Sequence, residues 1–488
     1  MTKKSISRLL QASLMCCLAV LFTACDDIFA NEDNPSSAYL SIIEKPVTIK
    51  IGDTYKRTAS SLSDVVIEYT SSNTNVATVD NSGLVTAIAE GTATITATAT
   101  GYSSQNGKKI YQPASASYKV TVTPATVAVT GLTLNKANLR FGMNAPTAQA
   151  LIADVLPADA TDKTVTWTSS DPTVATVDAS GNVTPKAKGT ATITAKAGDQ
   201  TATSTIYVYD KIWNVNTDGD AAVTANESWL IEGDVTTSEY KSITIGAGAT
   251  VTLNGINITK GIECSGDATI ILADGSTNTV IGNYYPMTAG IVVGPSGTTL
   301  TIDAETAGDG KLNATGGTQS AGIGTSYNYG SDITCGAITI NGGEITAKGG
   351  SYAAGIGTGL AYNKNNTCGA ITINGGTVTA TGGFGAAGIG TGQAYGSGSN
   401  TCGAIAIGTG VTSVTATKGN SSPNSIGKGY TSAGTQNCGT ITFDTVQVFD
   451  GSAWSSDPME AGTYGGLNLA ISTTTNANDT WTLTPVAP

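Results

Sequence analysis

A repeat of 33 to 36 residues limits what this chain can fold into more than any other feature. The sequence C-G-A-I-T-I-N-G-G begins at Cys335 and again at Cys368, and a worn copy begins at Cys402. Cys438 marks the next period, so the four cysteines are spaced by 33, 34 and 36 residues. Self-similarity at this period is typical of a stacked array of small units rather than of one globular core.

Each period carries three short strand signals. Residues 371–373 and 378–380 alternate apolar and small polar side chains, and the N-G-G between them favours a tight corner. Residues 387–389 form a third signal after another Gly-Gly corner. Three strands and three corners predict one coil of a parallel β-helix, with neighbouring coils about 4.8 Å apart. We expect about seven coils between residues 241 and 443, and no window has the apolar spacing of a helical repeat.

Composition narrows the range of functions. The chain has 488 residues with 60 glycines, 12% charged residues, a net charge of −12 and no histidine. Its length favours about three domains, and its acidity argues against nucleic acid as a partner. The absence of histidine removes the commonest general base and metal ligand, and no cofactor is predicted.

The N-terminus has the pattern of a targeting segment. Residues 1–24 combine a basic start with an apolar stretch, and the sequence F-T-A-C that ends at Cys25 resembles the lipobox of bacterial lipoproteins. The resemblance implies a lipid on Cys25 and a tether over 25–38; an ordinary secretory signal cut nearby is the alternative. Asp26 and Asp27 resemble sorting signals that carry some Gram-negative lipoproteins to the cell surface. We therefore expect a lipid anchor in the outer membrane of a Gram-negative bacterium, with the protein exposed outside.

A second repeat precedes the cysteine repeat. Residues 39–124 and 126–209 share V-A-T-V-D, G-x-V-T and G-T-A-T-I-T-A, with turn signals between short alternating strands. This pattern favours β-sandwiches, and both copies resemble the group-2 bacterial Ig-like domain. Trp167 is the expected core aromatic of the second copy, with Tyr69 in its place in the first. The resemblance implies a stalk.

The remaining residues, 210–488, are predicted to form the β-helix domain with its end caps. Residues 211–240 and 444–488 lack the period and are the expected caps. The region resembles β-helix domains on bacterial surface proteins, some of which are described as carbohydrate-binding. That resemblance implies an extracellular glycan, or a host or neighbouring-cell surface, as the partner. The fold class predicted for the whole chain is thus all-β: two Ig-like sandwiches followed by a parallel β-helix.

A tyrosine stripe is the candidate binding feature. One tyrosine follows the glycine of each A-G-I strand by seven residues, and polar loops carry all three. The stripe has two interpretations. The rings could stack on one another and seal the loops, or they could form a platform for sugar rings, with nearby asparagines offering hydrogen bonds. The candidate glycan-binding residues are Tyr329, Tyr362, Tyr395, Asn363, Asn365 and Asn366.

Two further features are compatible with metal binding or redox chemistry, and each also has a simpler interpretation. Oxygen donors alternate around a glycine in the weak calcium candidate Asn214, Asn216, Asp218 and Asp220, but the twelfth position is Ala225 instead of glutamate. A polar turn is the simpler interpretation, and no other metal site is predicted. The repeated cysteines, with Cys264 at an earlier coil, fit either disulfides or buried thiols that pack as small apolar groups; we favour thiols.

Catalysis is not predicted. Residues 210–488 contain no arginine, and no Asp or Glu lies between Ile345 and Phe443. Asp332 and Glu344 alone are too sparse for the paired carboxylates of polysaccharide-cleaving enzymes. The predicted function is adhesion or glycan binding without catalysis. The alternatives are a purely structural surface or pilus-associated component and, third, a polysaccharide lyase-like enzyme.

Overall fold

The computed structural model confirms the predicted fold class. It describes residues 36–37, 40–61, 65–100, 111–233, 240–306, 308–453, 459–473 and 479–487. Strands account for nearly all regular structure in these ranges, and α2 (Val215–Asp218) is a single helical turn. The predicted signal peptide and Cys25 lie outside the described residues.

The described chain forms two compact units. The first contains the residues up to Leu132, with 155–164 and 197–200, and the second contains 133–154, 165–196 and the residues from Thr201 onward. Each unit is described by itself.

Two facing sheets build the first Ig-like sandwich. One sheet has the order β3-β11-β9-β6 and the other β4-β8-β7. Alternate side chains of β9 and β11 point inward, so Ile95, Tyr118 and Val120 are buried between the sheets. The strands are β1 (Ser36–Ser37), β2 (Leu40–Ser41), β3 (Val47–Lys50), β4 (Thr54–Lys56), β5 (Ser60–Ser61), β6 (Ile67–Ser71), β7 (Ala77–Val79), β8 (Leu84–Ala87), β9 (Gly91–Ala99), β10 (Tyr111–Gln112) and β11 (Ala114–Thr123).

The second Ig-like copy repeats this arrangement. Its sheets have the orders β13-β20-β19-β16 and β14-β18-β17, around a core that includes Leu139, Phe141 and Ile193. Trp167 is half-buried and packs against this core. The strands are β12 (Gly131–Leu134), β13 (Asn138–Gly142), β14 (Gln149–Ala150), β15 (Ala153–Leu156), β16 (Thr166–Ser169), β17 (Ala175–Val177), β18 (Asn182–Pro185), β19 (Gly189–Ala197) and β20 (Gln200–Tyr209).

One glycine in each Ig-like copy makes room for the aromatic side chain expected in its core, Tyr69 in the first copy and Trp167 in the second. Gly83 and Gly181 both have positive φ, at 77° and 83°. A Cβ atom on Gly181 would lie 2.9 Å from the Trp167 ring, and one on Gly83 would lie 3.1 Å from the Tyr69 ring. The Tyr69 hydroxyl accepts a hydrogen bond from the Ala59 backbone N–H at 2.7 Å. The larger Trp167 ring lies at the edge of its core, whereas Tyr69 is buried.

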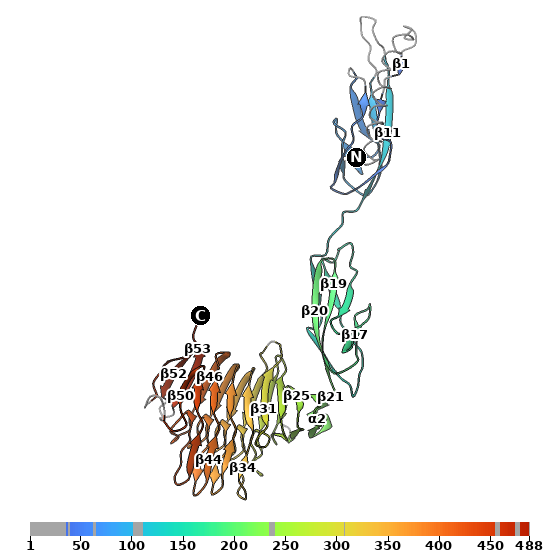
Figure 1. The fold of residues 1–488 in the computed structure, drawn as a ribbon. Helices are drawn as coiled ribbons and strands as arrows, with labels where there is room; N and C mark the ends of the chain where they lie inside the picture. The colour runs from blue at the N-terminus through green and yellow to red at the C-terminus, as the bar shows by residue number, and fades with distance from the viewer. Residues whose placement is uncertain are drawn as a thin grey trace, which may run out of the picture. The chain divides into compact units, whose positions relative to one another are not determined.

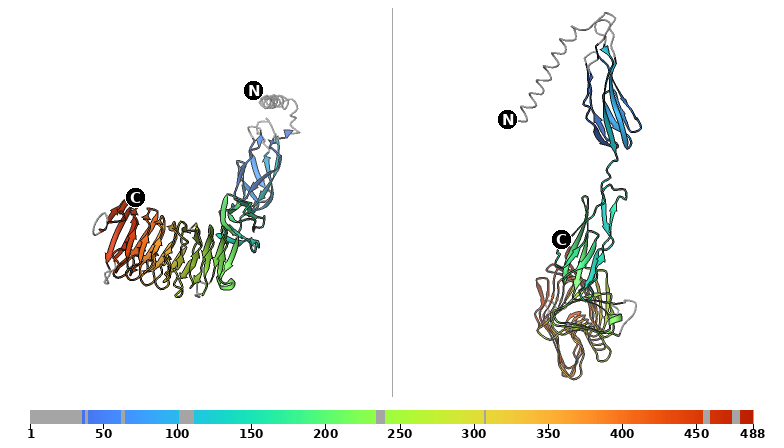
Figure 2. Two further views of the ribbon diagram at one scale, coloured as in Figure 1. Left: turned by 60° about the horizontal axis from the view of Figure 1, so that its bottom comes forward. Right: turned by 90° about the vertical axis from the view of Figure 1, so that its right-hand side faces the viewer.

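From Lys211 onward the chain forms a solenoid of stacked coils with three long faces (Figures 1 and 2). Strands within each face pair in parallel with the coils before and after them. Face 1 comprises β21 (Lys211–Asn214), β23 (Ser228–Glu232), β25 (Ala249–Asn254), β28 (Ala268–Leu272), β31 (Thr299–Ala304), β35 (Ala337–Ile340), β40 (Ile371–Ile373), β45 (Ile405–Ile407) and β49 (Ile441–Phe443). Face 2 comprises β26 (Asn257–Ile258), β29 (Thr277–Ile281), β32 (Lys311–Thr315), β36 (Glu344–Lys348), β41 (Gly376–Thr381) and β46 (Val411–Thr417). Face 3 comprises β22 (Ala221–Val223), β24 (Ile243–Ile245), β27 (Ile262–Cys264), β30 (Ile291–Val292), β33 (Ile323–Gly324), β37 (Ile356–Gly357), β42 (Ile389–Gly390) and β47 (Ile426–Gly427).

The later coils have the polar loops expected from the sequence, but these loops contain short paired strands that the sequence did not predict. After face 3 the chain makes further short strands before it returns to face 1, and we call this segment the outer lobe. Its strands are β34 (Ile333–Thr334), β39 (Asn366–Cys368), β44 (Ser399–Cys402), β48 (Thr435–Cys438), β38 (Ala361–Tyr362) and β43 (Ala394–Tyr395). The outer lobe accounts for the longer period of these coils.

The stack also begins earlier than predicted. Residues 211–240 were expected to form a cap, but β21 and β23 pair in parallel with each other and with β25 on face 1. Face 1 therefore carries two more parallel strands than the seven between 241 and 443. These first two coils have no described face 2 strand, so one of the three strand signals that identify a coil in the sequence is absent from them.

Antiparallel strands close the C-terminal end of the solenoid. β50 (Val446–Phe449) folds back on β49, and β53 (Asp479–Pro485) pairs antiparallel with β46. β51 (Gly462–Tyr464) and β52 (Leu467–Thr473) extend that sheet. Reversed strands occupy the hydrogen-bonding edge of the last coil, which would otherwise be an open template for another chain.

Aliphatic side chains fill the interior in register. On face 1, Ile338, Ile371, Ile405 and Ile441 lie above one another and are fully buried. Repeating the same apolar positions in each coil produces one continuous core along the stack.

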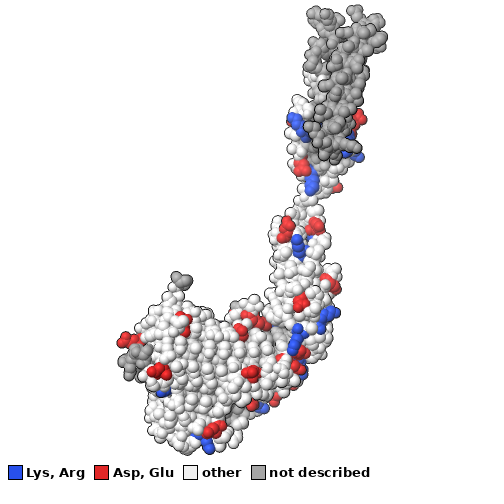
Figure 3. All heavy atoms as spheres, viewed as in Figure 1, with Lys and Arg blue, Asp and Glu red and all other residues white. Residues whose placement is uncertain are grey.

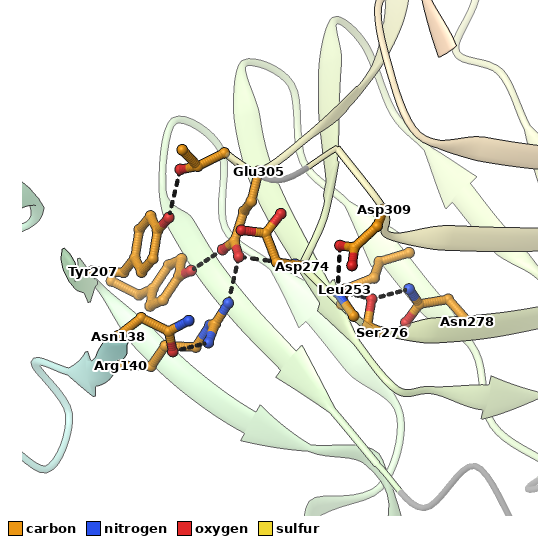
Figure 4. A network of polar contacts seen from close by, with 12 residues as sticks. Asn138, Arg140, Tyr207, Leu253, Asp274, Ser276, Asn278, Glu305 and Asp309 are labelled. Carbon is orange, nitrogen blue, oxygen red and sulfur yellow. Dashed lines mark hydrogen bonds and ion pairs between the residues drawn. The ribbon is translucent and has the colours of Figure 1, made fainter. Parts of the chain in front are cut away.

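A buried ion pair joins β13 of the second Ig-like copy to the solenoid (Figure 4). Both belong to the second compact unit. The Arg140 guanidinium donates to the Glu305 carboxylate and, at 2.7 Å, to Asn138 Oδ1. Glu305 also accepts from the Tyr209 hydroxyl at 3.4 Å and from the Asp274 backbone N–H at 3.1 Å. We call this network the joint.

Candidate functional site

Exposed aromatic rings set the outer surface of the solenoid apart from its core. Among the described residues from 211 to 473, each large apolar side chain that is exposed is Tyr or Phe, whereas Ile, Leu and Val are buried or half-buried. Rings with a polar tip tolerate water and still offer a flat apolar surface to a ligand. The exposed rings are Tyr240, Tyr284, Tyr285, Tyr329, Tyr362, Phe384, Tyr395 and Tyr430.

The predicted tyrosine stripe lies in the outer lobe. Tyr362 and Tyr395 are direct neighbours in the parallel pairing of β38 with β43, and Tyr329 lies just before β34. All three are exposed, at 64% for Tyr329, 46% for Tyr362 and 38% for Tyr395. Their side chains are therefore accessible to a ligand outside the solenoid.

The three rings do not form a continuous stack. The Tyr329 ring packs edge-on against Tyr327 at 4.6 Å, and the Tyr395 ring packs against Tyr352 at 6.5 Å. Within the described residues, no ring contact joins Tyr362 to either stripe neighbour. Burial and the neighbouring Tyr329 raise the pKa of Tyr327. The self-sealing interpretation therefore fits Tyr329 better than it fits Tyr362.

The three predicted asparagines differ in how they are placed. Asn363 is exposed, has φ of 57°, and its Oδ1 accepts the Ser397 N–H at 3.1 Å. Asn365 is exposed and bonds to both carboxylate oxygens of Asp332, at 2.8 Å and 3.1 Å, which lowers the pKa of Asp332. Asn366 is 3% exposed, and its Nδ2 donates inward to the Leu360 carbonyl at 2.9 Å. The prediction that Asn366 meets an external glycan does not hold, because its side chain faces the interior.

A groove missed by the sequence analysis lies where face 2 turns into face 3. It has a volume of about 480 Å³ and crosses three successive coils. Thr315, Lys348 and the Gly-Gly pairs after each face 2 strand line it, together with Tyr352 and Phe384. The sequence does contain a signal, because K-G-G or T-G-G ends each of these three strands, and an aromatic residue follows closely in two of the coils, at Tyr352 and Phe384.

Glycine is required in the floor of this groove. A Cβ atom on Gly350 would collide with the Gly317 carbonyl oxygen, and one on Gly383 would collide with the Gly350 carbonyl oxygen. The coils stack too closely there for any side chain. The floor of the groove is therefore bare backbone.

Tyr352 joins the groove to the predicted stripe. Its ring lies 5.8 Å from Phe384 in the groove and 6.5 Å from Tyr395 in the outer lobe, with both pairs edge-to-face. Since Tyr395 neighbours Tyr362 in the sheet, one aromatic surface runs from the groove to the stripe. We call the four residues Tyr352, Phe384, Tyr362 and Tyr395 the aromatic surface.

Charge is sparse around the aromatic surface. Residues 345–443 contain four lysines and no acidic residue, although the whole chain carries a net charge of −12. Figure 3 shows that the visible face of the solenoid is mostly uncharged. A ligand would therefore meet aromatic rings, backbone groups and a few lysines there.

The repeated cysteines form a buried ladder in the outer lobe. Cys368 pairs in register with Cys402, and Cys402 with Cys438, and the described cysteines are free thiols. Cys264 lies on β27 of face 3 and is not part of this ladder. A hydrogen bond with Cys335 and burial raise the pKa of Cys368, whereas the hydrogen bond from Cys402 and nearby Lys428 lower that of Cys438. The thiols pack as small apolar groups, as favoured from the sequence.

The calcium candidate forms a turn with internal hydrogen bonds. Asn214 caps α2 by accepting the Asn216 N–H at 2.9 Å, and Asp218 accepts the Asn214 N–H at 3.0 Å. Asp220 accepts the Ser242 N–H at 2.8 Å. These contacts fit the polar turn. In the described parts of the chain, no three acidic or cysteine side chains gather closely enough to hold a metal ion.

The two acidic residues that the sequence singled out, in the coil before the acid-free stretch 345–443, are already engaged. Asp332 is bound by Asn365, and Glu344 forms an exposed ion pair with Lys311 at 2.7 Å.

No helix in the described ranges is long and apolar enough to cross a membrane.

Family models match the two Ig-like copies and the middle of the solenoid. Residues 40–110 and 143–208 match the bacterial Ig-like domain (group 2). Residues 308–327, 338–360 and 371–393 match the beta helix repeat. The last two segments include most of the groove and Tyr352 and Phe384.

Relatives share only segments with this chain. An Ig-like virion protein of Serratia phage KSP90 is 48% identical over 82 residues, which are 17% of this chain and 31% of that protein. Ice-binding protein 1 of Shewanella frigidimarina is 33% identical over 149 residues, 30% of this chain and 15% of its own length. Lacto-N-biosidase of Bifidobacterium bifidum is 43% identical over 91 residues, 18% of this chain and 8% of the enzyme. The chain thus spans less than a third of the length of each.

Solved structures resemble the chain only loosely. Mouse cadherin-23 EC22-24 has 14% identity and a TM-score of 0.22, covering 35% of this chain and 63% of that one. The S-layer protein rSbsC(31-844) has 21% identity and a TM-score of 0.18, covering 32% of this chain and 22% of that one. TM-scores this low do not bear on function. What the family matches do show is that the chain carries two bacterial Ig-like domains of group 2 and a beta helix repeat region, a combination that fits a surface or adhesion-type protein.

Proposed function

We propose that this protein binds glycans at the cell surface through the aromatic surface of its solenoid, without cleaving them. The Ig-like domains serve as a stalk, and the lipid on Cys25 anchors the chain in the outer membrane of a Gram-negative bacterium. The extracellular partner is a glycan on a host or neighbouring cell.

One observation carries this proposal: the exposed large apolar side chains described between residues 211 and 473 are aromatic. Two of them, Phe384 and Tyr395, contact the half-buried Tyr352 ring, and Tyr362 lies beside Tyr395 in the sheet. Sugar rings have an apolar C–H face and polar hydroxyls, and aromatic side chains with polar surroundings match both. Coils about 4.8 Å apart offer rings at a repeat close to the length of a sugar unit. The scarcity of acidic groups near these rings supports binding without cleavage, since glycosidic bond cleavage ordinarily uses paired carboxylates.

A purely structural surface or pilus-associated component is the second candidate. The joint is compatible with it, because a buried ion pair between Arg140 and Glu305 fixes the second Ig-like copy on the solenoid. Rigid attachment suits a structural element as well as it suits the display of a binding head.

A glycan array probed with the full chain tests the proposal. We expect binding to at least one glycan class, and loss of binding in Tyr362→Ala at an unchanged melting temperature, because this ring is 46% exposed and has no described ring contact within the stripe. Tyr240→Ala is the matched control, since Tyr240 is also exposed, at 63%, but lies outside the aromatic surface. A chain that binds no glycan, or a Tyr362→Ala variant that binds as before, would contradict the proposal.

A further inference from the structure

We infer that the groove between faces 2 and 3 is a subsite for a carboxylate-bearing saccharide unit. The inference rests on the proposed glycan binding and names the class of sugar that this part of the surface takes. Lys348 is the group that recognises the carboxylate, and the rings of Tyr352 and Phe384 hold the sugar ring.

Lys348 is an exposed ammonium group without a described acidic partner. On face 2 it lies between Thr315 of the preceding coil and Thr381 of the next, neither of which is charged. The other lysines near face 2 are already engaged: Lys311 pairs with Glu344 at 2.7 Å, and Lys418 pairs with Asp479 at 2.7 Å. Since no described ion pair includes Lys348, this ammonium group is available to an anion from outside.

The groove places this charge beside two rings. Lys348, Tyr352 and Phe384 line the same space of about 480 Å³, and the two rings lie 5.8 Å apart edge-to-face. Phe384 is 47% exposed. A uronic or other acidic sugar offers an apolar ring face to aromatic side chains and a carboxylate to an ammonium group, so both of its recognition features find a partner here.

Tyr352 occupies a corner of its coil that has positive φ, at 67°. The equivalent corners of the neighbouring coils hold Gln319, Gly385 and Ser421, with φ of 68°, 68° and 66°. Since the corner accepts several residue types, its backbone does not require a tyrosine, and the ring can be replaced there without a change of fold.

The bare floor makes room for the sugar. Because Gly350 and Gly383 leave no space for a Cβ atom, their backbone groups form the bottom of the groove. A flat ring can approach that backbone closely.

The test compares saccharides that differ only in their carboxylates. The full chain is titrated with pectate, alginate and hyaluronate and with the carboxyl-reduced form of each. We expect tighter binding of at least one acidic form than of its reduced counterpart, and weaker binding as salt rises. Lys348→Gln should lower affinity for that acidic form about tenfold and remove the preference. Lys119→Gln, the same change on an exposed strand residue of the first Ig-like copy, should leave both unchanged.

A second variant separates binding from folding. Asparagine tolerates positive φ, so Tyr352→Asn should keep the corner and lose affinity for the acidic form. No preference for acidic forms, or Lys348→Gln behaving like Lys119→Gln, would overturn the inference. If the chain binds neutral glycans and Tyr362→Ala abolishes that binding, the proposed function stands and this subsite alone fails. If no saccharide binds, both fail.

Discussion

Removing the Glu305 carboxylate should weaken the joint strongly. The side chains of Glu305 and Arg140 are only 4% and 16% exposed, and Glu305 accepts from Arg140, Tyr209 and the Asp274 N–H. Glu305→Ala would leave a mostly buried guanidinium whose Nε already has no partner. Breaking a buried pair from one side costs about 3 to 5 kcal/mol. Because Arg140 keeps its bond to Asn138 and some water contact, we expect a loss of about 3 kcal/mol.

Urea unfolding followed by tryptophan fluorescence measures this loss. Trp213 and Trp229 lie on β21 and β23, next to the second Ig-like copy in the chain, with ring centroids 5.7 Å apart. For a loss of this size the midpoint should fall by about 1 M urea or more. Replacing both partners by apolar residues, Arg140→Met with Glu305→Leu, should recover most of the loss, because no charge is then left buried.

A nearby surface pair provides the control. Lys188 and Asp210 lie 3.1 Å apart, but their side chains are 51% and 29% exposed. Lys188→Met should therefore cost less than about 1 kcal/mol. If Glu305→Ala costs no more than Lys188→Met, burial does not strengthen the joint as argued, and the reasoning is refuted.

Three further predictions follow from other parts of the chain. Cys25→Ala should abolish lipid labelling and release a soluble or unprocessed form; identical fractionation of mutant and parent without lipid would disprove the lipobox. Cys368→Ala should cost roughly 1 kcal/mol as a small cavity, and mass spectrometry of the unreduced protein should find free thiols along the ladder, whereas quantitative pairing would make them disulfides. Burial raises the pKa of Tyr209 from 10.0 to about 12, so the folded state holds this proton more tightly; the resulting stability, about 2 to 3 kcal/mol, is complete below pH 10 and lost as pH rises to about 12. Tyr209→Phe should flatten that loss in thermal melts, and equal pH dependence in both proteins would contradict the shift.

The solenoid could be predicted because its signal is repeated. The same apolar positions recur in each late coil, and the structure places them in register, as with Ile338, Ile371 and Ile405. The coils at 211–240 could not be found this way. No face 2 strand is described in them, so one of the three strand signals that define a coil is absent there.

The alternation of side chains along a strand explains why the prediction for Asn366 was wrong. Asn366 lies two residues before the buried Cys368 on β39, and residues two apart in a strand point to the same side. The sequence grouped Asn366 with its exposed neighbours because it assigned that segment to a loop. The burial pattern of β39 places Asn366 with the interior cysteine instead.

The groove could not be predicted from the repeat, because its walls come from different coils. Lys348 and Tyr352 come from one coil, but Phe384 and the Thr315 wall come from the coils on either side. A seven-residue offset within each repeat could find the stripe. Only the stacking of the coils reveals that Tyr352 bridges Phe384 and Tyr395.

One measurement tests the central claim directly. The full chain is titrated by calorimetry with the saccharide that gives the strongest array signal, and the recovered saccharide is then analysed by mass spectrometry. We predict saturable binding, weakened by Phe384→Ala and Tyr362→Ala, with the saccharide recovered at its original mass. Binding that survives the loss of both rings, or shortened or unsaturated products, would contradict a non-catalytic glycan-binding surface on the solenoid.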